Sequence, residues 1–166
     1  MNRMIVVLAI MVQGCTDYQG QGTSLSPGSA NETLELKLRV TDANVHNPRF
    51  NLTIRNRTSE PVLLSEEHLI PEFLSRVRDR HGEEMPAPFP PRERVLGKSD
   101  IVILGPLQVK ELYFPLSDVV FLPSLKSGKY RMICEYNIPE ALRTATWPVW
   151  CGKVVSNEVE FAVRGE

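Results

Sequence analysis

The sequence lacks a strong excess of either charge sign and lacks a long apolar run. It holds 19 basic and 20 acidic residues, which give a formal net charge of −1. That balance excludes the basic excess with which proteins bind nucleic acid. A membrane-spanning helix needs about 20 apolar residues, and the apolar run at residues 4–12 is too short for one. The sequence therefore predicts neither a nucleic-acid partner nor a membrane-spanning helix.

Motifs of known catalytic chemistry are also missing. The three histidines, His46, His68 and His81, form no His-Glu-x-x-His pattern and no Cys/His cluster with zinc spacing. There is no Gly-x-Ser-x-Gly elbow and no glycine-rich phosphate loop. We interpret Glu66-Glu67-His68 as a solvated loop rather than a set of metal ligands. These absences predict no cofactor, no metal and no enzymatic activity, and the alternative is an enzyme whose site follows no recognised motif.

The first 15 residues, MNRMIVVLAIMVQGC, have the pattern of an export signal. Arg3 is followed by the apolar run of residues 4–12, which has the length of a signal-peptide hydrophobic region. The run ends in Val12-Gln13-Gly14-Cys15, which resembles the lipobox of bacterial lipoproteins: an aliphatic, a variable and a small residue before cysteine. The resemblance implies that residues 1–14 are removed and that Cys15 carries acyl chains such as palmitate. The alternative is an ordinary cleaved signal peptide.

Residues 16–32 are rich in Gly, Ser, Thr and Gln and have almost no large apolar side chains. Such a composition does not offset the entropy of ordering, so it predicts a flexible tether. The expected organisation is a signal peptide at residues 1–14, a lipidated Cys15 with its tether up to residue 32, and one domain at residues 33–166. Stable anchoring needs more than one acyl chain. The lipobox resemblance implies lipid anchoring at the outer membrane or the outer face of the plasma membrane.

From residue 34 onwards, apolar and polar residues alternate over short segments separated by turn residues. This period of two is typical of half-buried strands. No amphipathic pattern is long enough for a helix, although residues 66–72 are compatible with one helical turn. Seven or eight short strands predict an all-β antiparallel sandwich. The strands are expected at residues 34–40, 50–55, 61–65, 73–79, 101–104, 107–116, 129–137 and 155–163.

A Gly-x-Tyr sequence at a late strand refines this prediction. Ser127-Gly128-Lys129-Tyr130 resembles the tyrosine corner of immunoglobulin-like domains, in which the phenol bonds back to the backbone of the preceding corner. The resemblance implies an immunoglobulin-like antiparallel β-sandwich. Cys134 follows the tyrosine by four positions rather than two, and no early strand holds a partner cysteine. The domain is therefore predicted to be immunoglobulin-like without being an immunoglobulin domain.

Two cysteines remain if Cys15 is acylated. Cys134 and Cys151 would form an even pair in an oxidising compartment, which favours a disulfide. Such a bridge would tie the long loop between them, and closing a loop of about 15 residues stabilises by about 3 kcal/mol in the chain-entropy model. Two buried free thiols are the alternative, because cysteine is among the most buried residue types.

The loop of residues 85–94, MPAPFPPRER, holds four prolines and favours the extended polyproline II conformation. Recognition surfaces often use that conformation, so Phe89, Arg92 and Arg94 are candidate binding residues. A stiff crossover between two sheets is the alternative interpretation.

Trp147 and Trp150 flank Pro148 in the last long loop. If exposed, they would mark a contact with a protein or carbohydrate, and if buried they would cap the core. We therefore predict an envelope lipoprotein whose non-catalytic domain binds a protein or glycan or has a structural role. A protease inhibitor that presents residues 85–94 is a second hypothesis, which rests on analogy of fold.

Overall fold

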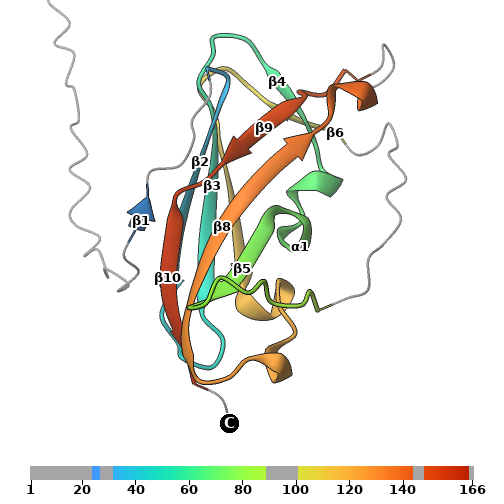
Figure 1. The fold of residues 1–166 in the computed structure, drawn as a ribbon. Coiled ribbons are helices and arrows are strands. Elements are labelled where there is room, and N and C mark those ends of the chain that lie inside the picture. Colours follow the sequence, from blue (N-terminus) through green and yellow to red (C-terminus); the bar gives the residue numbers. More distant parts are fainter. Residues whose placement is uncertain (1–23, 27–31, 89–100, 144–147, 165–166) are drawn as a thin grey trace, which may run out of the picture.

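The computed structural model describes residues 24–26, 32–88, 101–143 and 148–164, and it shows an all-β protein (Figure 1). Every strand pairing in these residues is antiparallel. The all-β prediction is thereby confirmed, and the immunoglobulin-like subtype stays a prediction. The strands are β1 (Ser24–Ser26), β2 (Leu34–Asp42), β3 (Arg49–Asn56), β4 (Val62–Ser65), β5 (Ser75–Asp79), β6 (Ile101–Leu104), β7 (Val109–Pro115), β8 (Gly128–Ile138), β9 (Gly152–Val155) and β10 (Glu158–Val163).

The strands form two larger sheets and one pair. The first sheet has the order β1-β10-β8-β5, with β9 also pairing with β8, and the second has the order β2-β3-β7. β4 and β6 form the separate pair. Short helices lie between the strands, namely η1 (Glu67–Leu69), α1 (Pro71–Leu74), η2 (Leu116–Asp118), η3 (Leu122–Ser124) and η4 (Glu140–Leu142). No helix among the described residues is long and apolar enough to cross a membrane.

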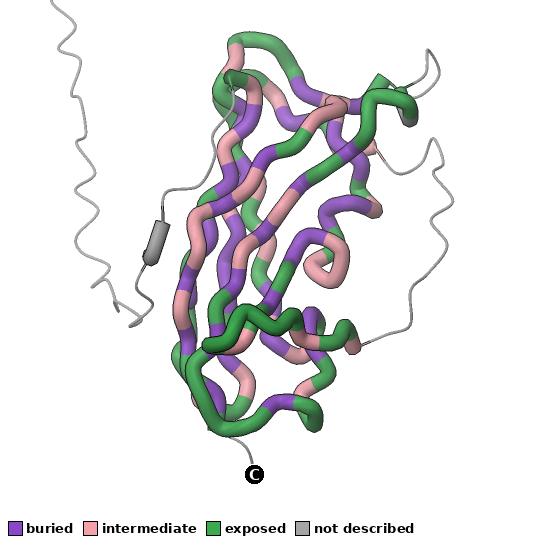
Figure 2. The backbone as a smooth tube through the Cα atoms, viewed as in Figure 1, coloured by how far each residue is buried: buried purple, intermediate pink, exposed green. Residues whose placement is uncertain are grey.

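Alternation along the strands explains why one face of each sheet is buried. In β2, Leu34, Leu36, Leu38 and Val40 are buried, while the polar residues between them point outwards. The same period runs along β8, whose inward residues include Met132. Figure 2 shows this alternation of buried and accessible positions along the long strands. The period predicted for these segments is confirmed.

The core joins the two larger sheets through aromatic rings. Phe50 of β3 has no exposed surface. It meets Phe161 of β10 edge to face, with ring centroids 5.1 Å apart, and lies 5.8 Å from Phe114 of β7. Edge-to-face and offset geometries are those that aromatic pairs prefer. Phe50 therefore ties the second sheet to the first across the interior.

The closing strand differs from the expected single strand at residues 155–163. Along β8, two residues lie between Met132 and Glu135, whereas three lie between their partners Val159 and Val155. The extra residue is a β-bulge, which divides the segment into β9 and β10. At this bulge, the Asn157 amide oxygen accepts from the Leu38 N–H at 2.9 Å, and the Asn157 amide nitrogen donates to the Leu38 carbonyl at 3.0 Å.

Two other predicted strands are shorter than expected because helical turns and tight turns take their ends. Pro71 opens α1, so Phe73 and Leu74 belong to a helical turn instead of a strand at residues 73–79. Residues 105–108 form a turn before β7, and Leu107 there has φ 56°. A positive φ is uncommon for a residue with a Cβ, and alternating polarity gives no sign of it.

Asn56 fixes that turn at the end of β3. Its side chain is fully buried, and its amide nitrogen donates to the carbonyls of Glu60, Leu104 and Gly105 at 2.7, 3.1 and 2.9 Å. Its amide oxygen accepts from both the backbone N–H and the hydroxyl of Thr58. One amide therefore holds together the loop after β3 and the turn before β7.

Part of the stretch expected to be a tether joins the fold. Ser24–Ser26 pair with β10, with Ser24 opposite Val159 and Ser26 opposite Glu158. Figure 1 shows this short strand beside the first sheet. The segment between the predicted lipidation site and the first strand is thus residues 16–23 instead of residues 16–32.

Candidate functional site

A cavity of about 580 Å³ lies at the end of the domain where β10 finishes. Val163 of β10 and Leu125 are buried and give the cavity an apolar lining. The exposed side chains of His46, Lys126 and Arg164 supply its polar lining together with Ser127. The volume falls in the range of small-molecule sites, which combine apolar walls with a few polar groups.

The turn that carries His46 is held in place from both sides. The Asp42 carboxylate accepts from the Asn44 N–H, and the Asn44 amide oxygen accepts from the His46 N–H at 2.9 Å. Such side-chain-to-backbone bonds are typical of Asx turns. On the far side, the Arg164 N–H donates to the Val45 carbonyl at 2.7 Å. His46 and Arg164 therefore sit on segments that are bonded to each other.

The Tyr130 phenol fixes the backbone of Lys126, which also lines the cavity. The Tyr130 phenol donates to the Lys126 carbonyl at 2.9 Å and accepts from the Lys126 N–H at 3.1 Å. The bond that the resemblance implied is therefore present, and its effect here is to fix the backbone of a cavity residue. The Tyr130 ring stacks on Phe161 with centroids 6.0 Å apart. The corner thus connects the cavity wall directly to the core.

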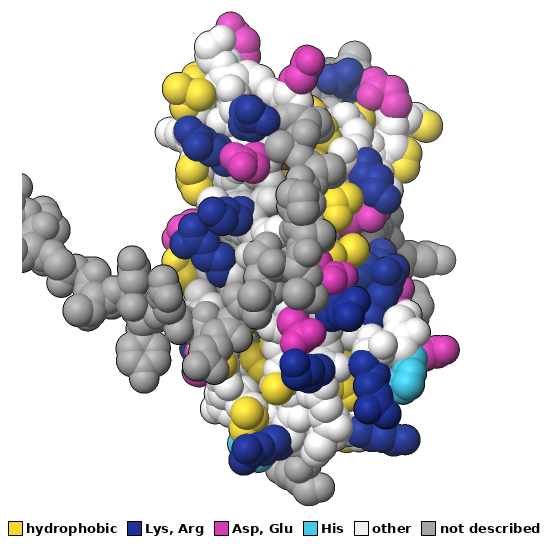
Figure 3. All heavy atoms as spheres, turned by 60° about the vertical axis from the view of Figure 1, so that its left-hand side comes forward, with side chains coloured by type: hydrophobic (Ala, Val, Ile, Leu, Met, Phe, Trp, Pro, Cys, Tyr) yellow, Lys and Arg dark blue, Asp and Glu magenta, His cyan; other side chains and the backbone are white. Residues whose placement is uncertain are grey.

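The cavity has a single-sign electrostatic character. His46, Lys126 and Arg164 line it, and no Asp or Glu among the described residues does so. By contrast, basic and acidic side chains are interspersed over the face in Figure 3. A concave surface lined by cations raises the local concentration of anions. This geometry suits the binding of an anionic group.

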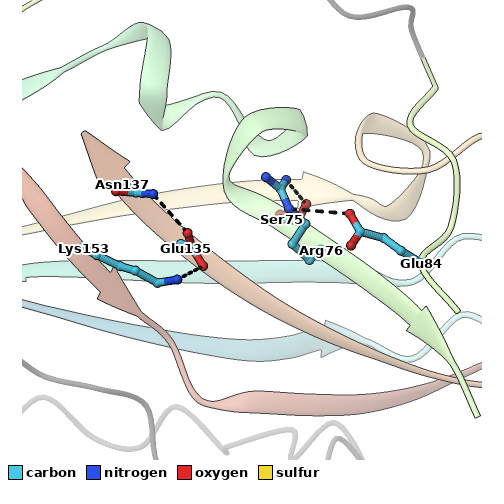
Figure 4. A network of polar contacts seen from close by, with 6 residues as sticks. All are labelled: Ser75, Arg76, Glu84, Glu135, Asn137 and Lys153. Atoms are coloured by element: carbon cyan, nitrogen blue, oxygen red, sulfur yellow. Dashed lines mark hydrogen bonds and ion pairs between the residues drawn. The ribbon is translucent and has the colours of Figure 1, made fainter. Parts of the chain in front are cut away.

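The outer face of the first sheet carries ion pairs instead of a site. Lys153 bonds to Glu135 at 2.9 Å, and Arg76 lies 3.5 Å from Glu84 (Figure 4). Asn137 donates to the same Glu135 carboxylate at 3.4 Å. Exposed pairs of this kind contribute about 0–1 kcal/mol each. Their charges are already matched within the sheet, which leaves little for a ligand.

Of the predicted binding residues, only Trp150 falls within the described part of the chain. It is half-buried, its ring lies 5.7 Å from the Tyr136 ring, and its backbone N–H donates to the Leu63 carbonyl at 2.7 Å. Gly152 allows this packing, because a Cβ there would lie 2.9 Å from the indole and its φ is 139°. Trp150 therefore packs on the core, as the second interpretation of the tryptophans predicted.

The remaining candidate residues lie outside the described ranges, namely Cys15, Phe89, Arg92, Arg94 and Trp147. The start of the proline-rich loop is described and is attached to the domain. The Met85 N–H donates to the Val77 carbonyl at 2.8 Å, and the Phe121 N–H donates to the Pro86 carbonyl at 3.2 Å. The loop therefore leaves the domain from a fixed point beside β5.

The interpretation of His68 as a residue of a solvated loop is wrong. His68 is buried, and its Nδ1 lies 2.9 Å from the Ser65 hydroxyl, which is also buried. The Tyr136 phenol accepts from the Ser65 N–H at 2.9 Å, and burial raises the pKa of that phenol. The Ser65–His68 pair is closed off from solvent, and it links η1 to β8 through hydrogen bonds and ring contact.

The predicted disulfide is not formed. Cys134 and Cys151 are both free thiols. Gly152 pairs with Ile138, four residues beyond Cys134 in β8, which corresponds to about 13 Å along a strand. A disulfide needs Cα atoms within about 7 Å. Cys134 instead lies 3.4 Å from the Ser75 hydroxyl, so the register of β8 and β9 excludes the bridge.

The two thiols are expected to differ sharply in alkylation. Burial raises the pKa of the Cys134 thiol to about 12, and its side chain has no exposed surface. Cys151 is partly exposed, although burial also raises its pKa. In the Cys15→Ser chain, iodoacetamide should therefore modify Cys151 in the native state and Cys134 only after unfolding. Peptide mass mapping measures both.

Cys151→Ser is the control for this experiment and should abolish native-state labelling. Equal labelling of the two cysteines, or a chain with no free thiol before reduction, would contradict the observed packing.

Compared with known proteins, the chain matches no protein-family model and no curated protein. Sequence reasoning missed the cavity, because the turn at His46, the corner at Lys126 and the end of β10 are far apart in the chain. The tyrosine-corner pattern was the one available signal, since it marked residues 127–130 as a fixed corner.

Proposed function

We propose that this chain is an exported lipoprotein, anchored through an acylated Cys15, whose β domain is a non-catalytic binding module of the bacterial cell envelope. The observation that carries the proposal is the run of residues 4–12 ending in Val12-Gln13-Gly14-Cys15. The fold is compatible with this anchor, because only residues 16–23 lie between Cys15 and β1. β1 pairs with β10 at one side of the domain.

The binding role is supported by the cavity at the end of β10. A backbone hydrogen bond joins Arg164 to Val45, and the Tyr130 phenol holds the backbone of Lys126, so a ligand meets a preformed surface. Its lining combines buried apolar side chains with exposed cations. The buried Ser65 and His68 form a structural pair, and Cys134 is shielded from solvent. An envelope protein or glycan that bears anionic groups is the partner we propose.

Intact mass spectrometry of the protein from native membranes tests the anchor. The expected mass corresponds to residues 15–166 plus two or three acyl chains, because the lipobox resemblance implies cleavage before Cys15. Cys15→Ser should abolish acylation and release the protein from the membrane fraction. Cys151→Ser is the matched control, since it removes a cysteine while leaving the lipobox intact, and should retain the acyl mass. An unacylated wild-type chain that keeps residues 1–14 would refute the proposal.

A further inference from the structure

The cavity at the end of β10 is lined by His46, Lys126 and Arg164. These residues indicate the chemistry of a ligand that would fit there. The cations Lys126 and Arg164 line it together with His46, and no acidic residue of the described chain is part of that lining. None of the ion pairs among the described residues, such as the pair between Lys129 and Glu160 at 2.9 Å, involves Lys126 or Arg164. Among the described residues, the lining therefore holds two cations and no acidic partner for them, which favours an anionic ligand.

The shape of the lining defines the rest of the ligand. Val163 and Leu125 are 5% and 7% exposed and form an apolar part of the wall. Arg164 and Lys126 lie at the same cavity with their side chains exposed. An arginine fork pairs with phosphate or carboxylate through two parallel hydrogen bonds, and lysine adds a point charge. A ligand that fits both parts has an anionic group next to an apolar group.

We propose that this cavity binds a phosphate ester whose phosphate is held by Lys126 and Arg164 and whose apolar group lies against Leu125 and Val163. This inference rests on the binding role proposed above and does not depend on the acylation of Cys15. The phosphate is that of a free organic phosphate or that of a phospholipid headgroup, and the probes below distinguish these two sources. The Tyr130 phenol holds the backbone of Lys126, and Val45 holds the backbone of Arg164, so the backbone of both residues is in place before the ligand arrives.

The test is a ¹⁵N NMR titration of the full chain as isolated, in neutral detergent micelles. Three probes are added separately: phenyl phosphate, inorganic phosphate, and phosphatidylglycerol mixed into the micelles. We expect the amides of Lys126, Ser127 and Arg164 to shift with phenyl phosphate or with phosphatidylglycerol. If phenyl phosphate responds, it should bind several-fold more tightly than inorganic phosphate. A response to phenyl phosphate identifies a free ester as the source, and a response to phosphatidylglycerol alone identifies the headgroup.

Two double variants separate a site from general charge attraction. Lys126→Ala with Arg164→Ala should weaken binding of the responding probe at least about tenfold, because two charge-assisted hydrogen bonds are lost. Lys37→Ala with Arg39→Ala removes the same charge from exposed positions of β2, outside the cavity, and should change binding less than about twofold. Spectra away from the altered residues show whether each variant keeps its fold.

Equal weakening by the two double variants would overturn the proposal, as would shifts that avoid the cavity or the absence of any response to the organic probes. Inorganic phosphate binding as tightly as phenyl phosphate would refute the role of the apolar wall. An unacylated Cys15 would refute the anchor but not the cavity, since the titration reads the cavity amides directly.

Discussion

Replacement of Asn56 by alanine is expected to destabilise the fold by about 3 kcal/mol or more. The substitution deletes the buried amide that donates to three carbonyls and accepts twice from Thr58. A buried polar group left without its partner costs about 1–3 kcal/mol, and several groups lose theirs here. Urea unfolding monitored by circular dichroism measures this loss as a decrease in the urea concentration at the midpoint. The slope of the unfolding free energy against urea concentration should stay the same.

Two further variants sharpen this prediction. Asn56→Asp replaces the donor with an oxygen that faces three carbonyl oxygens, so its pKa rises in the folded state. Its stability should therefore be highest below the carboxyl's unfolded pKa of about 4 and fall as the pH rises through the folded pKa. Asn137→Ala, an exposed site with one weak bond, should change stability by less than about 0.5 kcal/mol. If Asn56→Ala lowered the free energy of unfolding by no more than Asn137→Ala does, the hydrogen-bond network around Asn56 would be contradicted.

Phe50→Ala is expected to cost about 3–5 kcal/mol, the range for a large buried aromatic. The ring is fully buried and touches Phe114 in its own sheet and Phe161 in the opposite one. Its removal leaves a cavity where the two sheets meet, and the surrounding strands relax only partly. Denaturant unfolding again measures the effect, and Phe50→Leu should recover most of the loss.

Tyr113→Ala is the matched control for Phe50→Ala. Tyr113 lies on neighbouring β7, is 67% exposed and pairs in register with Asn51. Truncation of this exposed ring should cost less than about 1 kcal/mol. If the two alanine variants were equally stable, the two sheets would not pack through Phe50 as the structure has them.

The sequence predicted those features of the fold that depend on nearby residues. The inward set of β2 follows from alternation at Leu34 and Leu36, and the inward set of β8 follows from alternation at Met132 and Cys134. The tyrosine corner followed from three residues at fixed spacing, Gly128 to Tyr130. Each of these signals is local, so no knowledge of the partner strand is needed to interpret it.

The features that were missed depend on pairings between distant segments. The alternation along β8 predicted that Cys134 points inwards, but it did not predict how β8 pairs with its neighbours. The pairing with β5 places Ser75, and not Cys151, beside Cys134. His68 is buried because Ser65 and Tyr136 meet it, and Tyr136 lies 68 residues further along the chain. The cavity likewise gathers three separate segments. Alternation of polarity along one segment does not indicate which distant segments it contacts.

The side chain of Asn157 has a consequence for the solubility of the protein. β2 is the outermost strand of its sheet, and an uncovered edge strand is a template for adding strands from other molecules. The amide of Asn157 occupies both the N–H and the carbonyl of Leu38, the same two groups that an added strand would take. The bulge therefore places the Asn157 side chain on the backbone hydrogen-bonding groups in the middle of this edge. There it interrupts the addition of strands from other molecules along β2.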